Sequence, residues 1–159
     1  MQRLAIPTQF AFNYVHRYPY DGPPLLPVEI AGTDAFGILQ GETIDTYAKL
    51  DTGASGCVFP ADFARRMRIN LAAGELVPVE DFHGDSQSLP EVPIMLRICG
   101  EWMMTKAVFD WRLDKNAEPI IGREGVFPRF GFALFHQDGL LFASHEEMSG
   151  TAALWSLNG

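Results

Sequence analysis

Hydrophobic and polar residues alternate with a period of two over several stretches of this chain. In Ile44–Leu50 the apolar or neutral residues share one face, and the polar residues share the other face with Asp51. The same alternation recurs in Pro93–Cys99 and in Trp102–Phe109. Because successive side chains of a β-strand point to opposite faces, this pattern predicts strands with one buried and one exposed face.

Shorter strand-like segments fill much of the remaining chain and are separated by turn residues such as glycine, proline and aspartate. They are Gln9–His16, Leu26–Ala31, Phe36–Leu39, Cys57–Phe59, Leu76–Val79, Ile120–Ile121, Phe130–Phe135 and Leu140–Ser144. Two segments favour helix: Pro60–Met67, with proline at its first turn, and the turn Arg123–Phe127. The pattern predicts a mostly β protein in a single lobe, with one or two short helices.

Composition and charge exclude several classes of partner. The chain has 159 residues, of which 47% are hydrophobic, and its net charge of −8 argues against binding to nucleic acid. No apolar run approaches the ~20 residues of a membrane-spanning helix, and the start does not read as a signal peptide. Cys57 and Cys99 suit buried thiols in a reducing compartment, although the sequence leaves a bridge between them open. We therefore expect a cytoplasmic protein without a membrane or nucleic-acid partner.

The stretch Asp51–Ser55 carries the main candidate for chemistry. It reads Asp-Thr-Gly-Ala-Ser and follows a predicted strand, so it places a carboxylate at a sharp turn. Thr52 can donate and accept a hydrogen bond, and Gly53 lets backbone N–H groups approach the carboxylate. A strand end with an Asp-Gly type turn would explain the tripeptide alone. A second element downstream, Ile120–Glu124, contains two apolar residues, glycine, arginine and an acidic residue.

In this order, and in a chain of this length, the two elements resemble those of the retropepsin-like aspartic proteases, especially the bacterial and cellular members. The resemblance implies a closed β-barrel of the acid protease fold over residues 25–145. It leaves an N-terminal extension and strand over 1–24 and a C-terminal tail over 146–159. It also implies that Asp51 is catalytic. The residues implied to support its loop are Thr52, Gly53, Ala54 and Ser55, and those implied to pack behind it are Ile121, Gly122 and Arg123.

The expected activity is hydrolysis of peptide bonds in a peptide or protein substrate, with no cofactor and no metal. An aspartic protease needs two carboxylates that share a proton, one to activate water and one to polarise the scissile carbonyl. This chain has a single Asp-Thr-Gly, so the resemblance implies a homodimer in which two copies of Asp51 meet at a two-fold axis. Thr52 would hydrogen-bond across that axis. By order along the chain, the flap would hold Phe82, His83 and Gly84.

One position departs from the family pattern. Many retropepsins carry an acidic residue where this chain has Ser55, and that residue pairs with the arginine of the second element. Arg123 would therefore need another partner, such as Glu124, Asp62 or a backbone carbonyl. This departure favours an alternative, a catalytically weak or inactive retropepsin-like module for dimerisation or peptide binding.

Other enzyme classes fit the sequence less well. The four histidines lack the spacing of zinc ligands, and no serine shows a His–Asp arrangement. An aspartyl-phosphate enzyme would need Mg²⁺ ligands and a parallel sheet with crossover helices, whereas this chain has no long helical segment between its strands.

Overall fold

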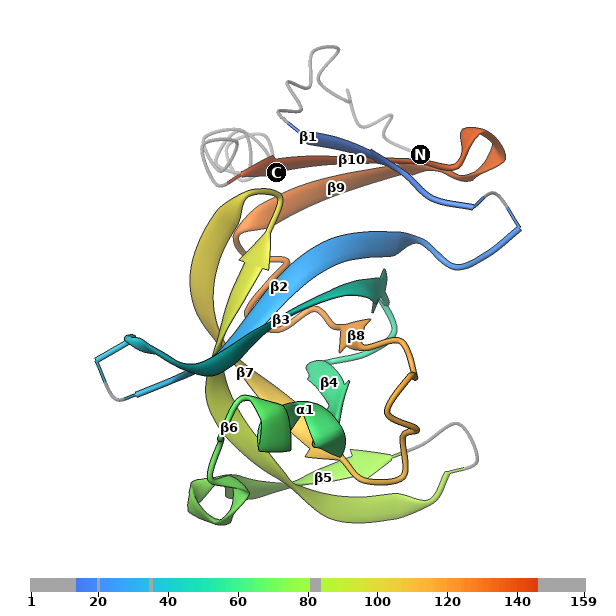
Figure 1. Cartoon of the computed structure of the whole chain (residues 1–159). Coiled ribbons are helices and arrows are strands. Elements are labelled where there is room, and N and C mark those ends of the chain that lie inside the picture. Colours follow the sequence, from blue (N-terminus) through green and yellow to red (C-terminus); the bar gives the residue numbers. More distant parts are fainter. Residues whose placement is uncertain (1–13, 20, 35, 81–83, 146–159) are drawn as a thin grey trace, which may run out of the picture.

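β-Strands dominate the computed structural model, which describes residues 14–19, 21–34, 36–80 and 84–145 (Figure 1). The strands are β1 (Tyr14–Arg17), β2 (Leu25–Thr33), β3 (Leu39–Leu50), β4 (Cys57–Pro60), β5 (Glu75–Glu80), β6 (Ser86–Ile98), β7 (Glu101–Asp110), β8 (Ile120–Ile121), β9 (Phe130–Phe135) and β10 (Leu140–His145). The described helices are α1 (Ala61–Arg66) and two 3₁₀ turns, Leu71–Ala73 and His136–Asp138. The prediction of a mostly β chain with short helices is confirmed.

Seven of these strands form one sheet in the order β2-β3-β8-β4-β7-β6-β5. β2 also pairs with β6, so the hydrogen-bonded order returns to its first strand, as a closed barrel requires. Most pairs are antiparallel, but β8 runs parallel to β3 and β4 runs parallel to β7. The short strand β8 lies between β3 and β4 and joins the two halves of the sheet.

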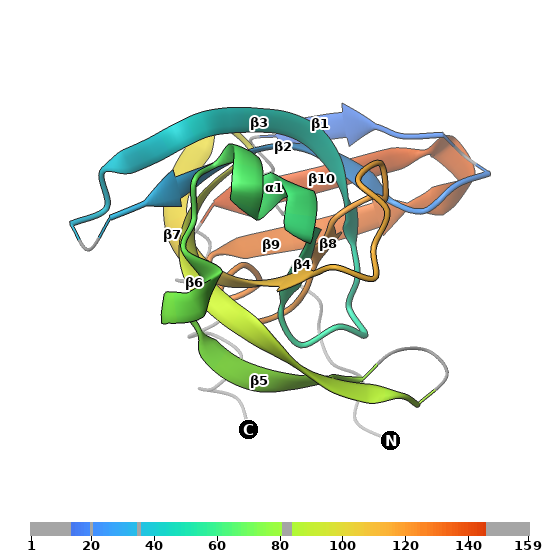
Figure 2. The same ribbon diagram turned by 60° about the horizontal axis from the view of Figure 1, so that its bottom comes forward.

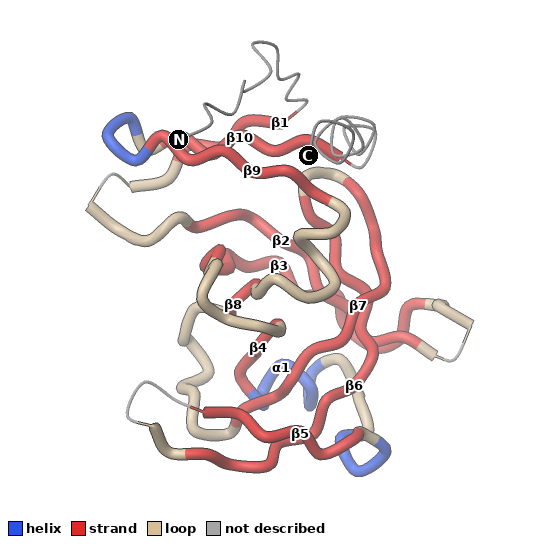
Figure 3. Tube along the Cα trace, turned by 180° about the vertical axis from the view of Figure 1, so that it is seen from behind, coloured by secondary structure: helices blue, strands red, loops and turns tan. Residues whose placement is uncertain are grey.

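A smaller sheet of three strands, β1-β10-β9, lies across one end of the larger sheet (Figures 1 and 3). Its buried residues Phe130, Leu141 and Ala143 belong to the same hydrophobic cluster as Leu26 of β2. One continuous core therefore joins the two sheets.

The alternation seen in the sequence matches the burial of the long strands. In β3, Ile44 and Ala48 are buried while Asp45 and Tyr47 are exposed. The inward residues of β6, from Leu89 to Ile98, are almost completely buried. In β7 the residues at odd positions from 103 to 109 are buried, and Val108 and Asp110 near its end are buried on the other face as well. The residues that form the core between the strands therefore follow the alternation seen in the sequence.

The predicted helix Pro60–Met67 is confirmed as α1. Pro60 precedes its first residue, and Phe63 and Met67 are buried on the face that packs against β3, β4 and β7. The segment Arg123–Phe127 makes only a single helical hydrogen bond, from the Phe127 N–H to the Arg123 carbonyl. Gly125 stops it there, because its φ of +79° leaves the helical region.

One strand prediction is wrong. Residues 36–38 belong to the connection between β2 and β3, and β3 begins at Leu39 and continues through Gly41 for 12 residues. Gly41 reads as a turn in sequence, yet in the structure it has a φ of +68° within the strand. A Cβ at Gly41 would lie 2.3 Å from the carbonyl oxygen of Met67, so only glycine fits there. Of the predicted strand Gln9–His16, residues 9–13 lie outside the described residues.

Candidate active site

Asp51 lies immediately after β3 in a loop that backbone hydrogen bonds close. The N–H of Asp51 donates to the carbonyl of Ile121 at 3.0 Å, and the N–H of Ala54 donates to the carbonyl of Asp51 at 3.3 Å. The Gly53 N–H donates to Asp51 Oδ1 at 2.9 Å. The strand end therefore presents one carboxylate in a fixed orientation.

The residues that follow β8 hydrogen-bond to the same loop through their backbone. The Arg123 N–H donates to the Ala54 carbonyl at 3.0 Å, and the Glu124 N–H donates to the Ser55 carbonyl at 2.6 Å. Together with the pairing of β8 to β3 and β4, these bonds connect the loop to two strands of the barrel. The loop is thus part of the sheet framework.

Gly122 is in direct contact with the backbone of the loop. A Cβ at this position would lie 2.2 Å from the carbonyl oxygen of Gly56 and 2.7 Å from its carbonyl carbon. Ile121, the preceding residue, is fully buried. The absence of a side chain at Gly122 allows β8 to approach the Asp51 loop so closely.

Arg123 does not make the contacts that the sequence suggested for its side chain. The side chain is exposed and forms no hydrogen bond or ion pair within the described residues. Asp62 is paired with Arg65 on α1 instead. The segment Ile120–Glu124 therefore supports the Asp51 loop through its backbone hydrogen bonds and through Gly122, and not through the Arg123 side chain.

A lysine two residues before Asp51 forms an ion pair with the carboxylate. Lys49 Nζ lies 3.3 Å from Asp51 Oδ2, and the two side chains are 27% and 24% exposed. Burial opposes the charge of Asp51, but the Gly53 N–H and the Lys49 ammonium outweigh it and lower the pKa of Asp51 below its ordinary value. These two groups therefore favour the ionised carboxylate.

A pocket of about 370 Å³ opens beside Asp51, Gly53 and Ala54. Its apolar lining consists of Val58, Val79, Leu113 and Ile120. Three charged residues, Glu80, Asp110 and Arg112, complete the lining. Arg112 donates to both carboxylate oxygens of Asp110, so these two charges compensate each other. The pocket has the size and the mainly apolar lining of a site that binds side chains or small ligands.

The hairpin of β5 and β6 carries one wall of this pocket and extends away from the body of the molecule (Figure 2). The last pair of this hairpin is Glu80 with Ser86. Gly84 is exposed and has a φ of +84°, a conformation that suits glycine in a tight connection. Phe82 and His83, which we assigned to the flap, lie outside the described residues.

Three loop residues of the motif face solvent. Thr52, Gly53 and Ser55 are exposed, whereas Ala54 is half-buried. Within the described residues, the Thr52 hydroxyl makes no hydrogen bond. An exposed hydroxyl next to the carboxylate is available to a second molecule.

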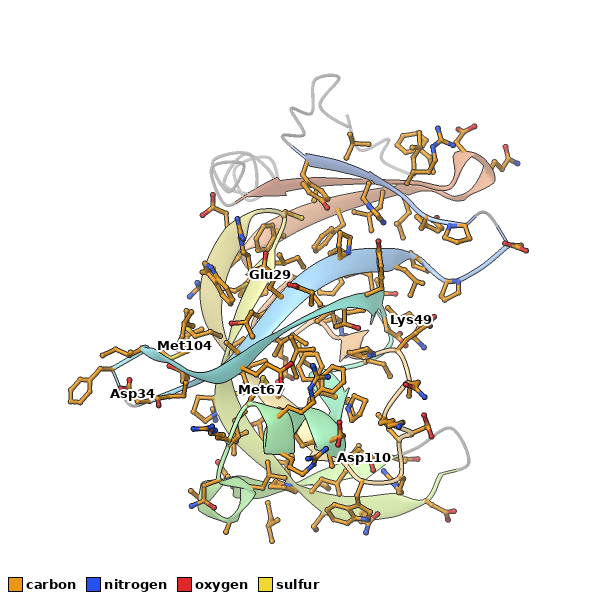
Figure 4. All side chains as sticks on the ribbon, viewed as in Figure 1. Glu29, Asp34, Lys49, Met67, Met104 and Asp110 are labelled. Carbon is orange, nitrogen blue, oxygen red and sulfur yellow. The ribbon has the colours of Figure 1, made fainter. Side chains whose placement is uncertain are left out.

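Sequence reasoning did not assign Lys49, Glu80, Asp110 or Arg112 to the site. For Lys49 a signal existed, because alternation along β3 places it on the same face as Asp51. Asp110 and Arg112 reach the pocket through the parallel pairing of β7 with β4, which no local pattern reveals. Figure 4 shows Lys49 near the end of β3 and Asp110 at the end of β7.

No family model and no curated protein sequence matches this chain. Among solved structures, the retropepsin-like aspartic protease from Rickettsia conorii matches with a TM-score of 0.51 and 13% identity, over 86% of this chain and 97% of that one. The simian foamy virus (mac) protease matches with a TM-score of 0.41 and 12% identity, over 65% of this chain and 92% of that one. EIAV protease, solved with the inhibitor HBY-793, matches with a TM-score of 0.46 and 17% identity, over 67% of this chain and 88% of that one.

The likeness to the Rickettsia structure shows that this chain has a retropepsin-like fold. The fold expected from Asp51–Ser55 and Ile120–Glu124 is therefore confirmed. Among the described residues, no helix is long and apolar enough to cross a membrane.

Proposed function

We propose that this protein is an aspartic endopeptidase whose active form is a homodimer. Each chain would contribute one Asp51, and the two carboxylates would share a proton at the two-fold axis. The protease domain would span residues 25–145, between the N-terminal segment 1–24 and the tail 146–159. We place the protein in the cytoplasm, in keeping with the free thiols of Cys57 and Cys99.

One observation carries the proposal. In a retropepsin-like fold, the Asp51 carboxylate stands at a strand end, held by the Gly53 N–H at 2.9 Å and next to a mainly apolar pocket. A loop that is fastened on both sides keeps a reacting group in place, and such positioning is a large part of catalysis. A lone carboxylate lacks the partner acid that this chemistry needs, which is why the proposal requires a second chain.

In the proposed dimer, the ionised Asp51 takes a proton from water as the water attacks the scissile carbonyl, and the protonated Asp51 of the other chain donates its proton to the carbonyl oxygen. The first Asp51 then passes the proton from water to the amide nitrogen, the C–N bond breaks and the amine leaves. A hydroxyl proton of the tetrahedral species returns to the second Asp51 and leaves the carboxylic acid product. The pocket lined by Val58, Val79 and Ile120 would receive an apolar substrate side chain. The β5–β6 hairpin would close over the bound peptide.

Asp51→Asn tests the proposal, with Asp45→Asn as the matched control. Asp45 is an exposed aspartate on the same strand, so both variants lose one carboxylate from β3. Wild type and Asp45→Asn should sediment as dimers and cleave a denatured protein in the range of about pH 3–7, chosen around free carboxyl pKa values of ~4. Asp51→Asn should sediment likewise and cleave nothing. Undiminished cleavage by Asp51→Asn would remove Asp51 as the catalyst.

The alternative function is a retropepsin-like module that dimerises or binds peptides with little or no catalysis. Ser55 in place of an acidic residue favours it, together with the Arg123 side chain that pairs with none of the described residues. A wild-type protein that is dimeric but inert on denatured substrates across the same pH range would favour this module. A strictly monomeric protein would contradict the homodimeric protease and the dimerisation module, and would leave a module that binds peptides as a single chain.

A further inference from the structure

Lys49 is held in place beside Asp51 by its own backbone. Its N–H donates to the carbonyl of Pro119 at 2.7 Å, and the residue pairs with Ile120 in the parallel ladder of β3 and β8. Residues two apart on a strand point to the same face, so the Lys49 side chain must emerge next to Asp51. The ion pair of 3.3 Å therefore follows from the fold.

The two oxygens of the Asp51 carboxylate have different partners. Oδ1 accepts the hydrogen bond from the Gly53 N–H at 2.9 Å, and Oδ2 faces the Lys49 ammonium. A carboxylate bound at both oxygens is fixed in rotation about its last bond. Lys49 thus contributes orientation as well as charge.

Other charged groups reach the same pocket from neighbouring elements. Glu80 comes from β5, and Asp110 and Arg112 come from the end of β7 and the residues that follow. Arg112 donates to both carboxylate oxygens of Asp110, which leaves little net charge from that side. Glu80 adds an acidic side chain to the pocket lining. Lys49 is the group at ion-pair distance from Asp51.

We propose that Lys49 is a positioning residue of the site: its ammonium orients Asp51 and moves the working pH range of the carboxylate pair to more acidic values. The inference rests on the proposed homodimer. There, two Asp51 side chains would be accompanied by two Lys49 ammonium groups. These cations stabilise the fully ionised pair, so the shared proton leaves at a lower pH than it would without them.

The direction of the effect follows from the sign of the charges. A cation beside a carboxyl group favours the ionised form, and its removal raises the pKa of that group. The single-proton form of the pair, which is the form that catalyses, then exists at higher pH.

The test compares Lys49→Met, Lys49→Arg and the control Lys106→Met. Lys106 forms an ion pair of similar length with Glu91, 3.4 Å, and neither residue lines the Asp51 pocket. The measurement is the pH dependence of cleavage of a denatured protein. Lys49→Met should move both limbs of the profile to higher pH. Lys49→Arg and Lys106→Met should keep the wild-type profile.

A second measurement does not depend on activity. Carbon-13 NMR of labelled aspartate follows the titration of Asp51 directly, and its signal is assigned by its loss in Asp51→Asn. The midpoint should be higher in Lys49→Met than in wild type and unchanged in Lys106→Met. This titration separates the two ideas, because a wild type without protease activity refutes the proposed function and leaves the role of Lys49 measurable.

Any of three results would overturn the inference. The first is a Lys49→Met protein whose Asp51 titration matches that of wild type. The second is an equal shift in Lys49→Met and Lys106→Met, which would assign the effect to overall charge. The third is a change in cleavage rate without a shift along the pH axis, which would show that Lys49 does not set the pH range.

Discussion

The contact between Gly122 and Gly56 allows a sharp test of how the candidate active-site loop is supported. In Gly122→Ala the new Cβ would lie 2.2, 2.7 and 2.9 Å from the oxygen, carbon and nitrogen of Gly56. All three are backbone atoms, so no side-chain rotation relieves the overlap. Either β8 or the Asp51 loop must move away.

The expected loss of stability follows from the contacts that this movement breaks. Overpacking of this kind costs about 1–3 kcal/mol. The two backbone hydrogen bonds from Arg123 to Ala54 and from Glu124 to Ser55 follow directly after Gly122, and each contributes about 1 kcal/mol. We therefore expect Gly122→Ala to lower the free energy of unfolding by about 3–5 kcal/mol, a large part of the ~5–15 kcal/mol typical of a domain.

The matched control is the other glycine of the same contact. A Cβ at Gly56 would meet no atom within 4 Å, and Gly56 is not among the residues with positive φ. Gly56→Ala should therefore stay within about 1 kcal/mol of wild type. Urea unfolding followed by tryptophan fluorescence measures both variants. Equal midpoints for the two would refute the view that close packing of β8 on the loop supports the site.

Two further predictions concern buried polar groups. Arg112→Ala removes the guanidinium that donates to both oxygens of Asp110, whose side chain is only 7% exposed. This variant should lower the free energy of unfolding, measured in urea, by about 1.5–3 kcal/mol. Unchanged stability would contradict the importance of this pair. Burial raises the pKa of Cys57 to about 11 and that of Cys99 to about 12, so both thiols should react slowly with a disulfide reagent at neutral pH and quickly after unfolding. Cys99 is the less buried of the two thiols. If one thiol reacts rapidly in the folded protein, we would assign that thiol to Cys99, and the predicted slow reaction of Cys99 would be wrong.

The strands could be predicted from the sequence wherever burial is decided locally. In β6 the alternation indicated the inward residues Ile94, Leu96 and Ile98 correctly, because each residue needs only to lie on one side of a strand. Helix α1 could be predicted for a similar reason: Pro60 begins it, and Phe63 and Met67 share its buried face. These features depend on neighbours within a few positions along the chain.

The features that sequence reasoning missed depend on contacts between distant segments. Gly41 reads as the end of a strand, but its positive φ is accommodated inside β3 because the carbonyl of Met67 packs against it. The parallel pairing of β4 with β7 brings Asp110 to the pocket, and nothing near Asp110 in sequence indicates a partner strand. Such contacts are set by the closure of the barrel.

The ion pair of Lys49 with Asp51 could have been predicted from the sequence if charge had been considered along with burial. Alternation already placed Lys49 and Asp51 on one face, and two opposite charges two residues apart on a strand lie close enough to interact. What the pattern lacked was the strand β8, which fixes the backbone of Lys49 through Pro119 and Ile120. The same two-residue strand is followed by Gly122, which packs against the backbone of Gly56 in the Asp51 loop. The orientation of the candidate carboxylate and the cation that tunes it therefore depend on one short segment, and a change there should affect both at once.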